Sequence, residues 1–526
     1  MIRLMTTTAC AAMLAGPALA EFELTILHTN DFHDRFEPIN QYDSTCGEED
    51  AAAGACFGGI ARMITAVEEA RGRAGGNVLL LDAGDQFQGS LFYTQYGGDL
   101  AAEFMTRLGY DAMAVGNHEF DDGPEGLAAF VEEVEFPVLS ANIDVSGEER
   151  LAGEVAKSAV LEVGGERVGV VSVLAEDTPE TSSPGPDVIF SPAADAAQAE
   201  IDRLTGEGVN KIVLLTHVGL PADRALAEAL TGVDLIIGGH SHTLLSNTAE
   251  DAAGPYPTMA NDVPIFQAYA YGKYLGEISV TFDDAGEVLA ISGDPILLDA
   301  SVAQDADALA RMEELAGPLE EIRSEVVAET DVPLEGSREV CRAEECTLGN
   351  LIADAMLERV RDQGIDVAIQ NGGGIRASID AGEITMGEVL TVLPFQNTLA
   401  TFTLTGQGIL DALENGVSEV EEGAGRFPQV AGMRFTWDAS AEPGSRIVSV
   451  EVSDGAGGYA PIDPDATYGV VSNNFLRGGG DGYATFAQDA ADAYDFGPDL
   501  ADVLAEHLAD GGASGAGPEG RITRQN

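Results

Sequence analysis

The sequence predicts an α/β fold in two domains. From Phe22 to about Val280, short apolar runs alternate with stretches of helical spacing, a pattern typical of layered α/β domains. Acidic, amide and imidazole side chains directly follow several of these runs, at the strand ends where such folds place ligand sites. A chain of 526 residues is also too long for one ordinary hydrophobic core, so a second domain is expected.

Each element of the first domain, expected at 21–299, rests on a local pattern. Continuous apolar runs predict buried strands at 24–27, 78–81, 112–115, 168–173, 212–215 and 235–237. Amphipathic spacing between them predicts helices at 61–70, 100–108 and 197–204.

The remaining chain predicts a linker and a second α/β domain. Residues 301–324 are rich in Ala and Glu, which indicates a linker helix within 300–325. The second domain, at 326–526, is expected to hold a helix at 348–360, strands at 367–369 and 399–404, and glycine-rich loops at 371–374 and 477–482. Beyond about Asp510 the chain is rich in Gly, Ala and Ser, and we expect a loose tail.

Residues 1–20 are typical of an export signal. The cation Arg3 precedes a weakly apolar stretch ending in Ala18-Leu19-Ala20, which predicts cleavage before Glu21. No later apolar run is long enough to span a bilayer. We therefore expect a periplasmic or secreted protein without a membrane anchor, and we make no prediction of its oligomeric state.

Four cysteines remain after the signal, in two close pairs. Proximity in an exported chain favours the disulfides Cys46–Cys56 and Cys341–Cys346, and the alternative is two pairs of free thiols.

The net charge of −63 restricts the partners. Such an acidic surface repels nucleic-acid polymers and anionic membranes. It is typical of adaptation to saline surroundings, although GC-rich coding would also explain why lysine occurs only at positions 157, 211 and 273. An anionic substrate would have to be attracted by a local cluster of metal ions and arginines.

Five of the seven histidines lie in short polar clusters in the first half of the chain. The clusters, one of which supplies only a carboxylate, are Asp31-Phe32-His33, Gly84-Asp85, Gly116-Asn117-His118-Glu119, His217 and Gly239-His240-Ser241-His242. Imidazole is the commonest metal ligand in proteins, and a carboxylate can bridge two divalent ions. Singly each cluster is a weak signal, but their order and their positions after strands together predict a two-metal centre.

In this order the clusters resemble the calcineurin-like metallophosphatase signature. The strings Leu-His-Thr-Asn-Asp at 27–31, Asp-Ala-Gly-Asp-Gln at 82–86 and Gly-Asn-His-Glu-Phe-Asp at 116–121 are similar to the secreted 5′-nucleotidase family. That resemblance implies a four-layer α/β/β/α sandwich for the first domain and two divalent metal ions, with Zn, Mn, Co or Mg as candidates. It implies one ion held by Asp31, His33, Asp85 and His242, and another held by Asp85, Asn117, His217 and His240.

The resemblance also implies a catalytic pair. His118 resembles the family's catalytic histidine, which protonates the leaving oxygen, and Asp121 resembles the residue that orients it. The alternative is a His-Asp pair that only closes a turn.

The resemblance extends over nearly the whole chain after residue 20 and implies a nucleotide site in the second domain. Phe395 and Phe475 would sandwich the base, and Asp481 would bind the ribose hydroxyls. Phosphate oxygens would be held by Arg342, Arg376 and Asn371, with Gly373 and Gly432 as further matching positions. Gln396 and Arg477-Gly478 depart from the commoner family residues, which puts base and sugar preference in doubt.

The sequence therefore predicts an exported phosphohydrolase that removes the 5′-phosphate from nucleoside monophosphates. Two alternatives share the architecture, a nucleotide-sugar pyrophosphatase and a 2′,3′-cyclic nucleotide phosphodiesterase/3′-nucleotidase; Asp121 favours the 5′-nucleotidase branch. A related thiosulfohydrolase would have no use for Phe395 and Phe475. A non-catalytic binding or adhesion protein should have lost some of the ligands, and all are present.

Overall fold

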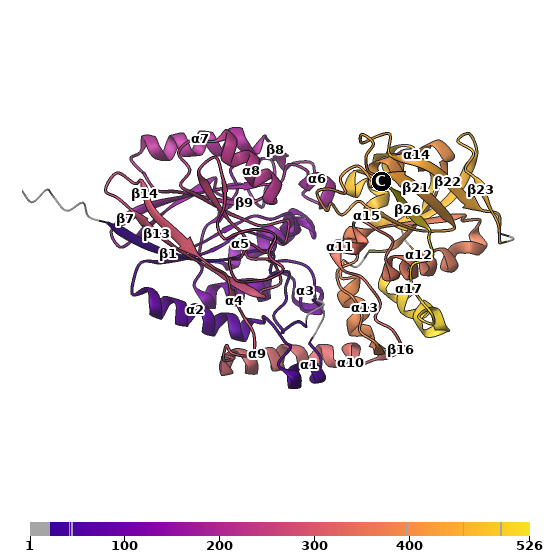
Figure 1. Cartoon of the computed structure of the whole chain (residues 1–526), viewed down its shortest axis with the longest axis horizontal. Helices are drawn as coiled ribbons and strands as arrows, with labels where there is room; N and C mark the ends of the chain where they lie inside the picture. Colours follow the sequence, from indigo (N-terminus) through magenta and orange to yellow (C-terminus); the bar gives the residue numbers. More distant parts are fainter. Residues whose placement is uncertain (1–20, 41–42, 44–45, 396, 456, 495–496) are drawn as a thin grey trace, which may run out of the picture.

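The chain folds into two α/β halves connected by helices along one side (Figure 1). The structure, a computed structural model, describes residues 21–526 except 41–42, 44–45, 396, 456 and 495–496. The expected export signal at 1–20 and Gln396 lie outside the described residues.

Two sheets form the centre of the first half. The first has the order β14-β13-β1-β2-β3-β4, with β15 paired to β13. Its strands are β1 (Phe22–Thr29), β2 (Val78–Asp82), β3 (Ala112–Ala114), β4 (Val138–Leu139), β13 (Tyr274–Phe282), β14 (Val288–Gly293) and β15 (Ile296–Leu297). The second has the order β11-β12-β10-β9-β7-β6. Its strands are β6 (Ser158–Val163), β7 (Glu166–Leu174), β9 (Ile212–His217), β10 (Leu235–Gly238), β11 (Thr258–Ala260) and β12 (Val263–Phe266).

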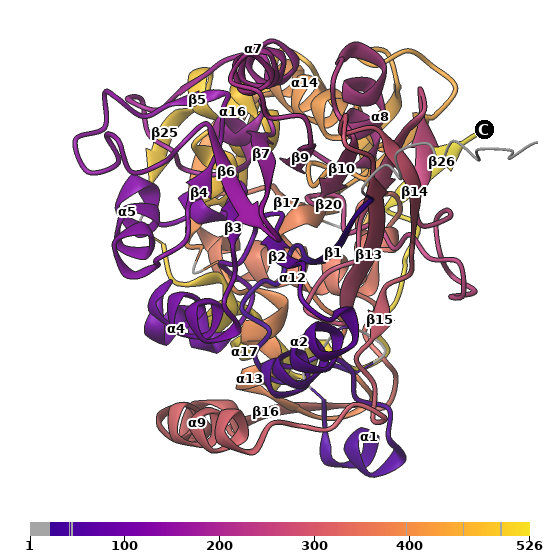
Figure 2. The ribbon, with the colours of Figure 1, turned by 90° about the vertical axis from the view of Figure 1, so that its left-hand side faces the viewer.

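Side-chain alternation along β1 explains the layers. Leu24 and Ile26 belong to the core between the two sheets, whereas Leu27 belongs to the core under the outer helices. That outer core is covered by α2 (Ile60–Ala74), α4 (Asp99–Leu108) and α5 (Gly123–Glu133). The opposite sheet is covered by α7 (Ala193–Gly206) and α8 (Leu220–Ala229), so Figure 2 shows the two sheets between helical layers. The predicted four-layer α/β/β/α sandwich is confirmed.

The parallel strands deliver the polar clusters to one edge. β1, β2 and β3 run parallel in the first sheet, as do β7, β9 and β10 in the second. Asp31 follows β1, Asp85 follows β2, and His217 is the last residue of β9. The carboxyl ends of these strands therefore gather the predicted ligands in one place.

The second half is built on the mixed sheet β20-β17-β24-β19-β25. Its strands are β17 (Val367–Asn371), β19 (Leu399–Thr405), β20 (Pro428–Ala431), β24 (Thr467–Asn473) and β25 (Ala491–Tyr494). One face packs against α12 (Thr347–Val360), α13 (Met386–Val392) and α17 (Leu500–His507). The other face packs against α14 (Gly406–Gly416) and a second sheet of β21 (Met433–Asp438), β22 (Ile447–Ser453), β23 (Tyr459–Pro461) and β26 (Ile522–Gln525).

The prediction of a loose C-terminal tail is wrong. β26 pairs in parallel with β21, and Ile522 joins the core around Trp437. Three backbone N–H groups, those of residues 519, 520 and 522, donate to the Glu345 carboxylate, which holds the approach to this strand. Composition alone favoured a loop, because β21 and Glu345, which hold this segment in place, lie far away in the sequence.

The predicted linker helix is interrupted. α9 (Ala306–Ala316) is followed by a 3₁₀ turn (Gly317–Leu319) and by α10 (Glu320–Arg323). Pro318 breaks the helix because proline has no amide hydrogen to donate. Ala308, Met312 and Leu315 pack into the outer core of the first half. α9 is therefore part of the first half.

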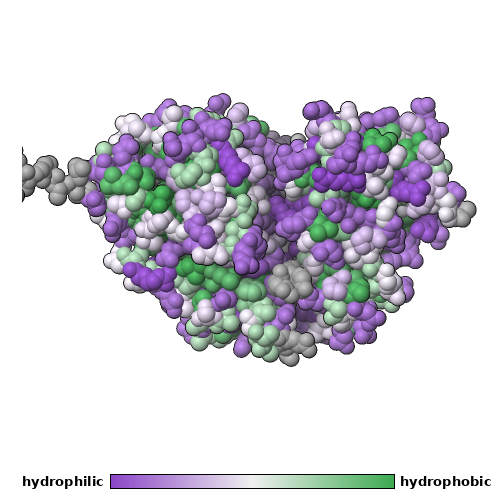
Figure 3. All heavy atoms as spheres, viewed as in Figure 1, coloured by the Kyte–Doolittle hydropathy of each residue, from purple (hydrophilic) through white to green (hydrophobic). Residues whose placement is uncertain are grey.

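The four cysteines form the disulfides Cys46–Cys56 and Cys341–Cys346. Within the described residues, no helix has both the length and the apolar character needed to cross a membrane. Figure 3 shows that polar side chains dominate this face and that it is hollowed between the two halves.

Candidate active site

The loops that carry the predicted ligands have unusual backbone conformations. Asp31, His33, Asp85, His240 and His242 all have positive φ, between 51° and 72°. Side chains other than glycine rarely adopt this region, and such residues cluster at functional sites because the surrounding structure enforces them. Gly116 is required here, since a Cβ at this position would lie 2.3 Å from Oδ1 of Asp85.

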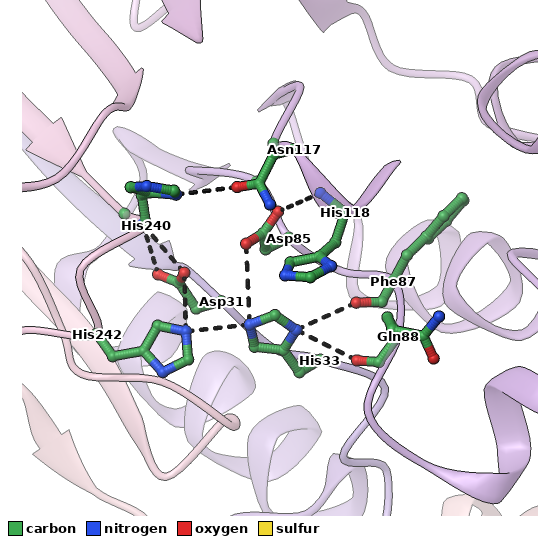
Figure 4. Close-up of polar contacts among 12 residues, drawn as sticks. Asp31, His33, Asp85, Phe87, Gln88, Asn117, His118, His240 and His242 are labelled. Atoms are coloured by element: carbon green, nitrogen blue, oxygen red, sulfur yellow. Dashed lines mark hydrogen bonds and ion pairs between the residues drawn. The ribbon is translucent and has the colours of Figure 1, made fainter. Parts of the chain in front are cut away.

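Two groups of donor atoms face each other at this edge (Figure 4). Asp31, His33 and His242 form one group, and Asp85, His217 and His240 form the other; a further set, His33, Asp85 and His118, overlaps both. In the first, the Nε2 atoms of His33 and His242 lie 3.0 Å apart, and His242 Nε2 lies 3.3 Å from Asp31 Oδ1. In the second, His217 Nε2 lies 3.0 Å from Asp85 Oδ2. Within each group the donor atoms lie within 4.8 Å of one another, which suits a divalent cation.

Backbone carbonyls orient the imidazoles. His33 Nδ1 lies 3.2 Å from the carbonyls of Phe87 and Gln88, and His217 Nδ1 lies 2.7 Å from that of Ala83. An Nδ1–H that donates to a carbonyl leaves Nε2 as the free lone pair, which is the arrangement that metal-binding histidines use.

Electrostatics keeps most of these histidines neutral. Burial, reinforced by His217, lowers the pKa of His240 to about 3. Burial also holds the pKa of His33 and of His242 well below the usual value, with Arg376 and Arg338 respectively acting in the same direction. At His217 burial is outweighed by the Asp85 carboxylate, which raises the pKa to about 10. Neutral imidazoles beside buried carboxylates fit a pair of divalent cations.

Asn117 and Glu119 complete the second group in different ways. Asn117 Oδ1 lies 2.9 Å from His240 Nδ1. The amide oxygen therefore lies beside the imidazole of the second donor group. The buried Glu119 carboxylate accepts backbone hydrogen bonds from residues 85, 86, 87 and 116. Glu119 therefore fixes the loop that carries Asp85. This role was not predicted, because only the folded loop brings the four amides together.

His118 stands beside both groups and has its own partner. Its Nδ1 lies 2.6 Å from Asp121 Oδ2, and the other oxygen of Asp121 accepts a hydrogen bond from Ser182 Oγ at 2.7 Å. Burial opposes the charged imidazole, but the Asp121 carboxylate outweighs it and raises the pKa of His118. The sequence did not point to Ser182, which is distant in the chain.

A single cavity of about 800 Å³ joins this edge to the second half. Four arginines of the second half line it, namely Arg338, Arg342, Arg376 and Arg426. Arg376 Nη2 lies 3.3 Å from His33 Nε2, and Arg338 Nη2 donates to the carbonyl of His240 at 3.4 Å. Arg338 and Arg376 therefore place positive charge directly against the metal-binding edge, although the protein as a whole is acidic. Arg338 was not predicted, because it lies outside the strings that carry the resemblance.

The other predicted nucleotide contacts also line this cavity, with one exception. Asn371, Gly373, Phe395, Phe475 and Asp481 are all part of its wall. Asn371 Nδ2 donates to Asp481 Oδ2 at 2.6 Å, and the Phe395 ring lies 5.7 Å from that of His118. Gly432 lies elsewhere. It occupies the turn between β20 and β21, where a Cβ would meet the carbonyl of Asp366, so its place in the substrate-site prediction is not supported.

Comparisons with known proteins cover both halves. The calcineurin-like phosphoesterase family matches residues 24–244, and the 5′-nucleotidase C-terminal domain matches residues 326–488. The 5′-nucleotidase of Diplobatis ommata is 40% identical over 96% of this chain and 90% of its own length. The human 5′-nucleotidase is 41% identical over 89% of this chain and 85% of its own length. The crystal structure of a 5′-nucleotidase precursor from Thermus thermophilus is 45% identical, with a TM-score of 0.91 over 96% of this chain and all of that one.

These matches make the protein a hydrolase of phosphate esters. Calcineurin-like phosphoesterases use two divalent metal ions, and the two donor groups described above supply ligands for both. With both domains present in the same order and with 40% identity along nearly its full length, the chain belongs to the 5′-nucleotidase family.

Proposed function

We propose that the protein hydrolyses nucleoside 5′-monophosphates to a nucleoside and inorganic phosphate. The observation that carries this proposal is the single cavity lined by His118 and the metal-binding edge on one side and by four arginines, two phenylalanines and Asp481 on the other. A phosphate ester attached to a flat base requires a metal-binding edge with a proton donor, arginines for the phosphate oxygens, and aromatic rings for the base.

The metal ligands are assigned in two sets. Asp31, His33, Asp85 and His242 would hold one ion, and Asp85, Asn117, His217 and His240 would hold the other. When bound, two divalent ions activate the attacking water and neutralise charge on the phosphoryl oxygens. Asp85 lies between the two donor groups, with Oδ2 at 3.0 Å from His217 Nε2 and 3.8 Å from His33 Nε2, which suits a bridging carboxylate.

His118 acts as the proton donor. Hydrolysis forms a bond between water oxygen and phosphorus and breaks the bond between phosphorus and O5′, and the departing O5′ needs a proton. His118 supplies it, and Asp121 keeps the imidazole protonated and turned toward the cavity.

The second half binds the substrate. Arg338, Arg342 and Arg376 each present a guanidinium to the cavity, and this group matches phosphate oxygens in a fixed geometry. Phe395 and Phe475 hold the base, while Asp481 and Asn371 hold the ribose and phosphate. Residues 21–299 thus carry the chemistry and residues 326–526 carry recognition, and residues 300–325, whose helix α9 packs on the first half, connect the two.

We also propose that the protein is exported. Disulfides persist in oxidising compartments, and the Cys46–Cys56 and Cys341–Cys346 bridges suit a periplasmic or secreted protein.

Hydrolysis of four substrates, each followed through the product that it forms, tests the function. AMP, UDP-glucose, 2′,3′-cyclic AMP and bis(p-nitrophenyl) phosphate are compared with Zn, Mn, Co or Mg added in turn. The proposal requires the highest kcat/KM on AMP. A higher value on UDP-glucose or on cyclic AMP would assign the pyrophosphatase or the cyclic phosphodiesterase activity instead.

A further inference from the structure

The segment between β12 and β13, residues 267–273, lies against the first donor group of the metal-binding edge. Its backbone is unusual, because Tyr269, Tyr271 and Gly272 all have positive φ, between 60° and 63°. Side chains other than glycine rarely adopt this region, and such residues cluster at functional sites because the surrounding structure enforces them. The consequence here is the placement of one aromatic ring, that of Tyr271.

Tyr271 contacts all three residues of the first donor group. Its ring centre lies 5.2 Å from that of His242, edge to face, and 5.7 Å from that of His33. Its backbone N–H donates to the carbonyl of Asp31 at 2.7 Å. A ring packed this closely restricts the orientations that the two imidazoles can adopt.

His242 depends on this packing more than the other histidine ligands do. A metal-binding imidazole ordinarily donates its second ring N–H to a carbonyl or carboxylate, which fixes the ring. The Nδ1 atoms of His33 and His217 have such carbonyl partners, whereas Nδ1 of His242 has no hydrogen-bond partner among the described residues. Within this part of the chain, the rings of His33 and Tyr271 are what orients His242.

The Tyr271 ring is itself held from several sides. Tyr271 is buried, with 7% of the residue exposed, and forms a small core with Ile39 and Ala270. The guanidinium carbon of buried Arg35 lies over the ring, 5.3 Å from its centre, and the Tyr269 ring meets it edge to face. A ring fixed in this way can act as a rigid support for the imidazoles beside it.

The second donor group has no comparable support. The rings of His217 and His240 meet edge to face, with their centres 5.1 Å apart. Within the residues that the structure describes, no phenylalanine, tyrosine or tryptophan ring lies against either of them. The contacts of Tyr271 are therefore specific to one of the two ion positions.

We propose that Tyr271 is a positioning residue for the ion held by Asp31, His33, Asp85 and His242. Its ring orients His242 and supports His33, so that both Nε2 atoms face the same cation. The inference rests on the ligand sets of the proposed function. Its readout is the affinity for metal measured without substrate, which does not depend on which phosphate ester is hydrolysed.

Equilibrium dialysis of the full-length protein against graded free concentrations of Mn²⁺ tests the proposal. We expect the wild type to bind two ions per chain. Tyr271→Ala should weaken one of them by about 10–100-fold, the range for loss of a residue that orients a ligand, and should leave the other unchanged. Tyr271→Phe should retain both affinities, because the ring and not the hydroxyl contacts the imidazoles.

Three further variants separate this role from a general effect on folding. Tyr271→Leu keeps apolar volume in the small core without a ring, so it serves if Tyr271→Ala fails to fold, and it should lose the same ion. Tyr274→Ala is the matched control and should bind both ions as the wild type does, because Tyr274 is partly buried at the start of β13 and its ring lies against Tyr269. In His242→Ala, which lacks the ligand itself, the addition of Tyr271→Ala should cause no further loss.

Anomalous diffraction from manganese then locates the ion that remains. At a limiting concentration of Mn²⁺, crystals of Tyr271→Ala should show an ion beside His217 and His240 and none beside His33 and His242. Unchanged affinities in both Tyr271→Ala and Tyr271→Leu, an equal loss of both ions, a loss in Tyr271→Phe as large as in Tyr271→Ala, or an ion retained only beside His33 and His242 would each overturn the proposal. If the wild type with both ions bound did not hydrolyse AMP, the proposed function would fail and this inference would stand.

Discussion

Asp121 and His118 are joined by a contact of 2.6 Å between Oδ2 and Nδ1. The second oxygen of the same carboxylate accepts a hydrogen bond from Ser182 Oγ, so the carboxylate cannot rotate freely. This arrangement fixes which imidazole nitrogen faces the cavity. Nδ1 is bound to Asp121, and Nε2 remains for the substrate.

Replacement of the proton donor should reduce rate without removing metal. We expect His118→Ala to lower kcat on AMP by about 10²–10⁴-fold, the range for a positioned acid. Metal analysis should still find two ions per chain, because His118 is not assigned as a ligand. Asp85→Ala is the matched comparison, since it should lose metal as well as rate. Purification of His118→Ala with one ion missing would mean that the roles are divided wrongly.

The pH dependence should report the same pair. The Asp121 carboxylate raises the pKa of His118 against the effect of burial, and the protonated imidazole is the active form. Activity is therefore present at lower pH and is lost as pH rises through the pKa of His118. In Asp121→Asn that pKa falls, so the alkaline limb of the kcat profile should move to lower pH. Ser182→Ala should move it less, because the carboxylate remains. An unchanged limb in Asp121→Asn would assign it to another group.

The metal-binding edge could be predicted from the sequence because the order of its ligands along the chain follows the order of the strands. Each predicted ligand follows or ends a parallel strand, and parallel strands present their carboxyl ends at one edge. Local strings such as Gly116-Asn117-His118 are also explained by geometry, because only glycine fits at position 116 next to Asp85.

The parts that were not predicted depend on contacts between distant segments. Arg338 reaches the carbonyl of His240, and Ser182 reaches Asp121, without a local pattern that marks either. The strand β26 forms only because β21 offers an edge. Gly432 matched the family pattern by position, but its role is to turn the chain beside Asp366. Spacing along the sequence could not distinguish that role from substrate contact.

Arg338 should contribute to substrate affinity. Its guanidinium lines the cavity next to Arg342 and Arg376, where a hydrogen bond to a charged group is worth about 1.5–3 kcal/mol. We expect Arg338→Ala to raise KM for AMP by about tenfold or more. Arg359→Ala is the matched control, because Arg359 lies half exposed on α12 and pairs with Glu506 at 3.7 Å. If both variants had the wild-type KM, Arg338 would have no part in phosphate binding.

The Cys341–Cys346 disulfide should matter more for binding than for folding. It closes the turn that carries Arg342, and both cysteines are fully buried. The double variant Cys341→Ser/Cys346→Ser should raise KM for AMP while thermal unfolding remains cooperative, because so short a loop restricts the unfolded chain little. Cys46→Ser/Cys56→Ser serves as control, since that bridge lies away from the active-site cavity. A KM equal to that of the wild type in the first variant would show that the bridge does not hold Arg342.

Phe475 should recognise the base and nothing else in the substrate. Its ring lines the cavity and packs so closely on Gly480 that a Cβ there would lie 2.5 Å from it, so the ring is held in place. Stacking on a base is worth about 1–3 kcal/mol, so Phe475→Ala should raise KM for AMP by about 5–150-fold. Ribose 5-phosphate lacks the base, and its KM should not change. Phe475 is a cleaner test than Phe395, whose ring also contacts His118. Equal losses on AMP and ribose 5-phosphate would mean that Phe475 supports the fold of the loop and does not bind the base.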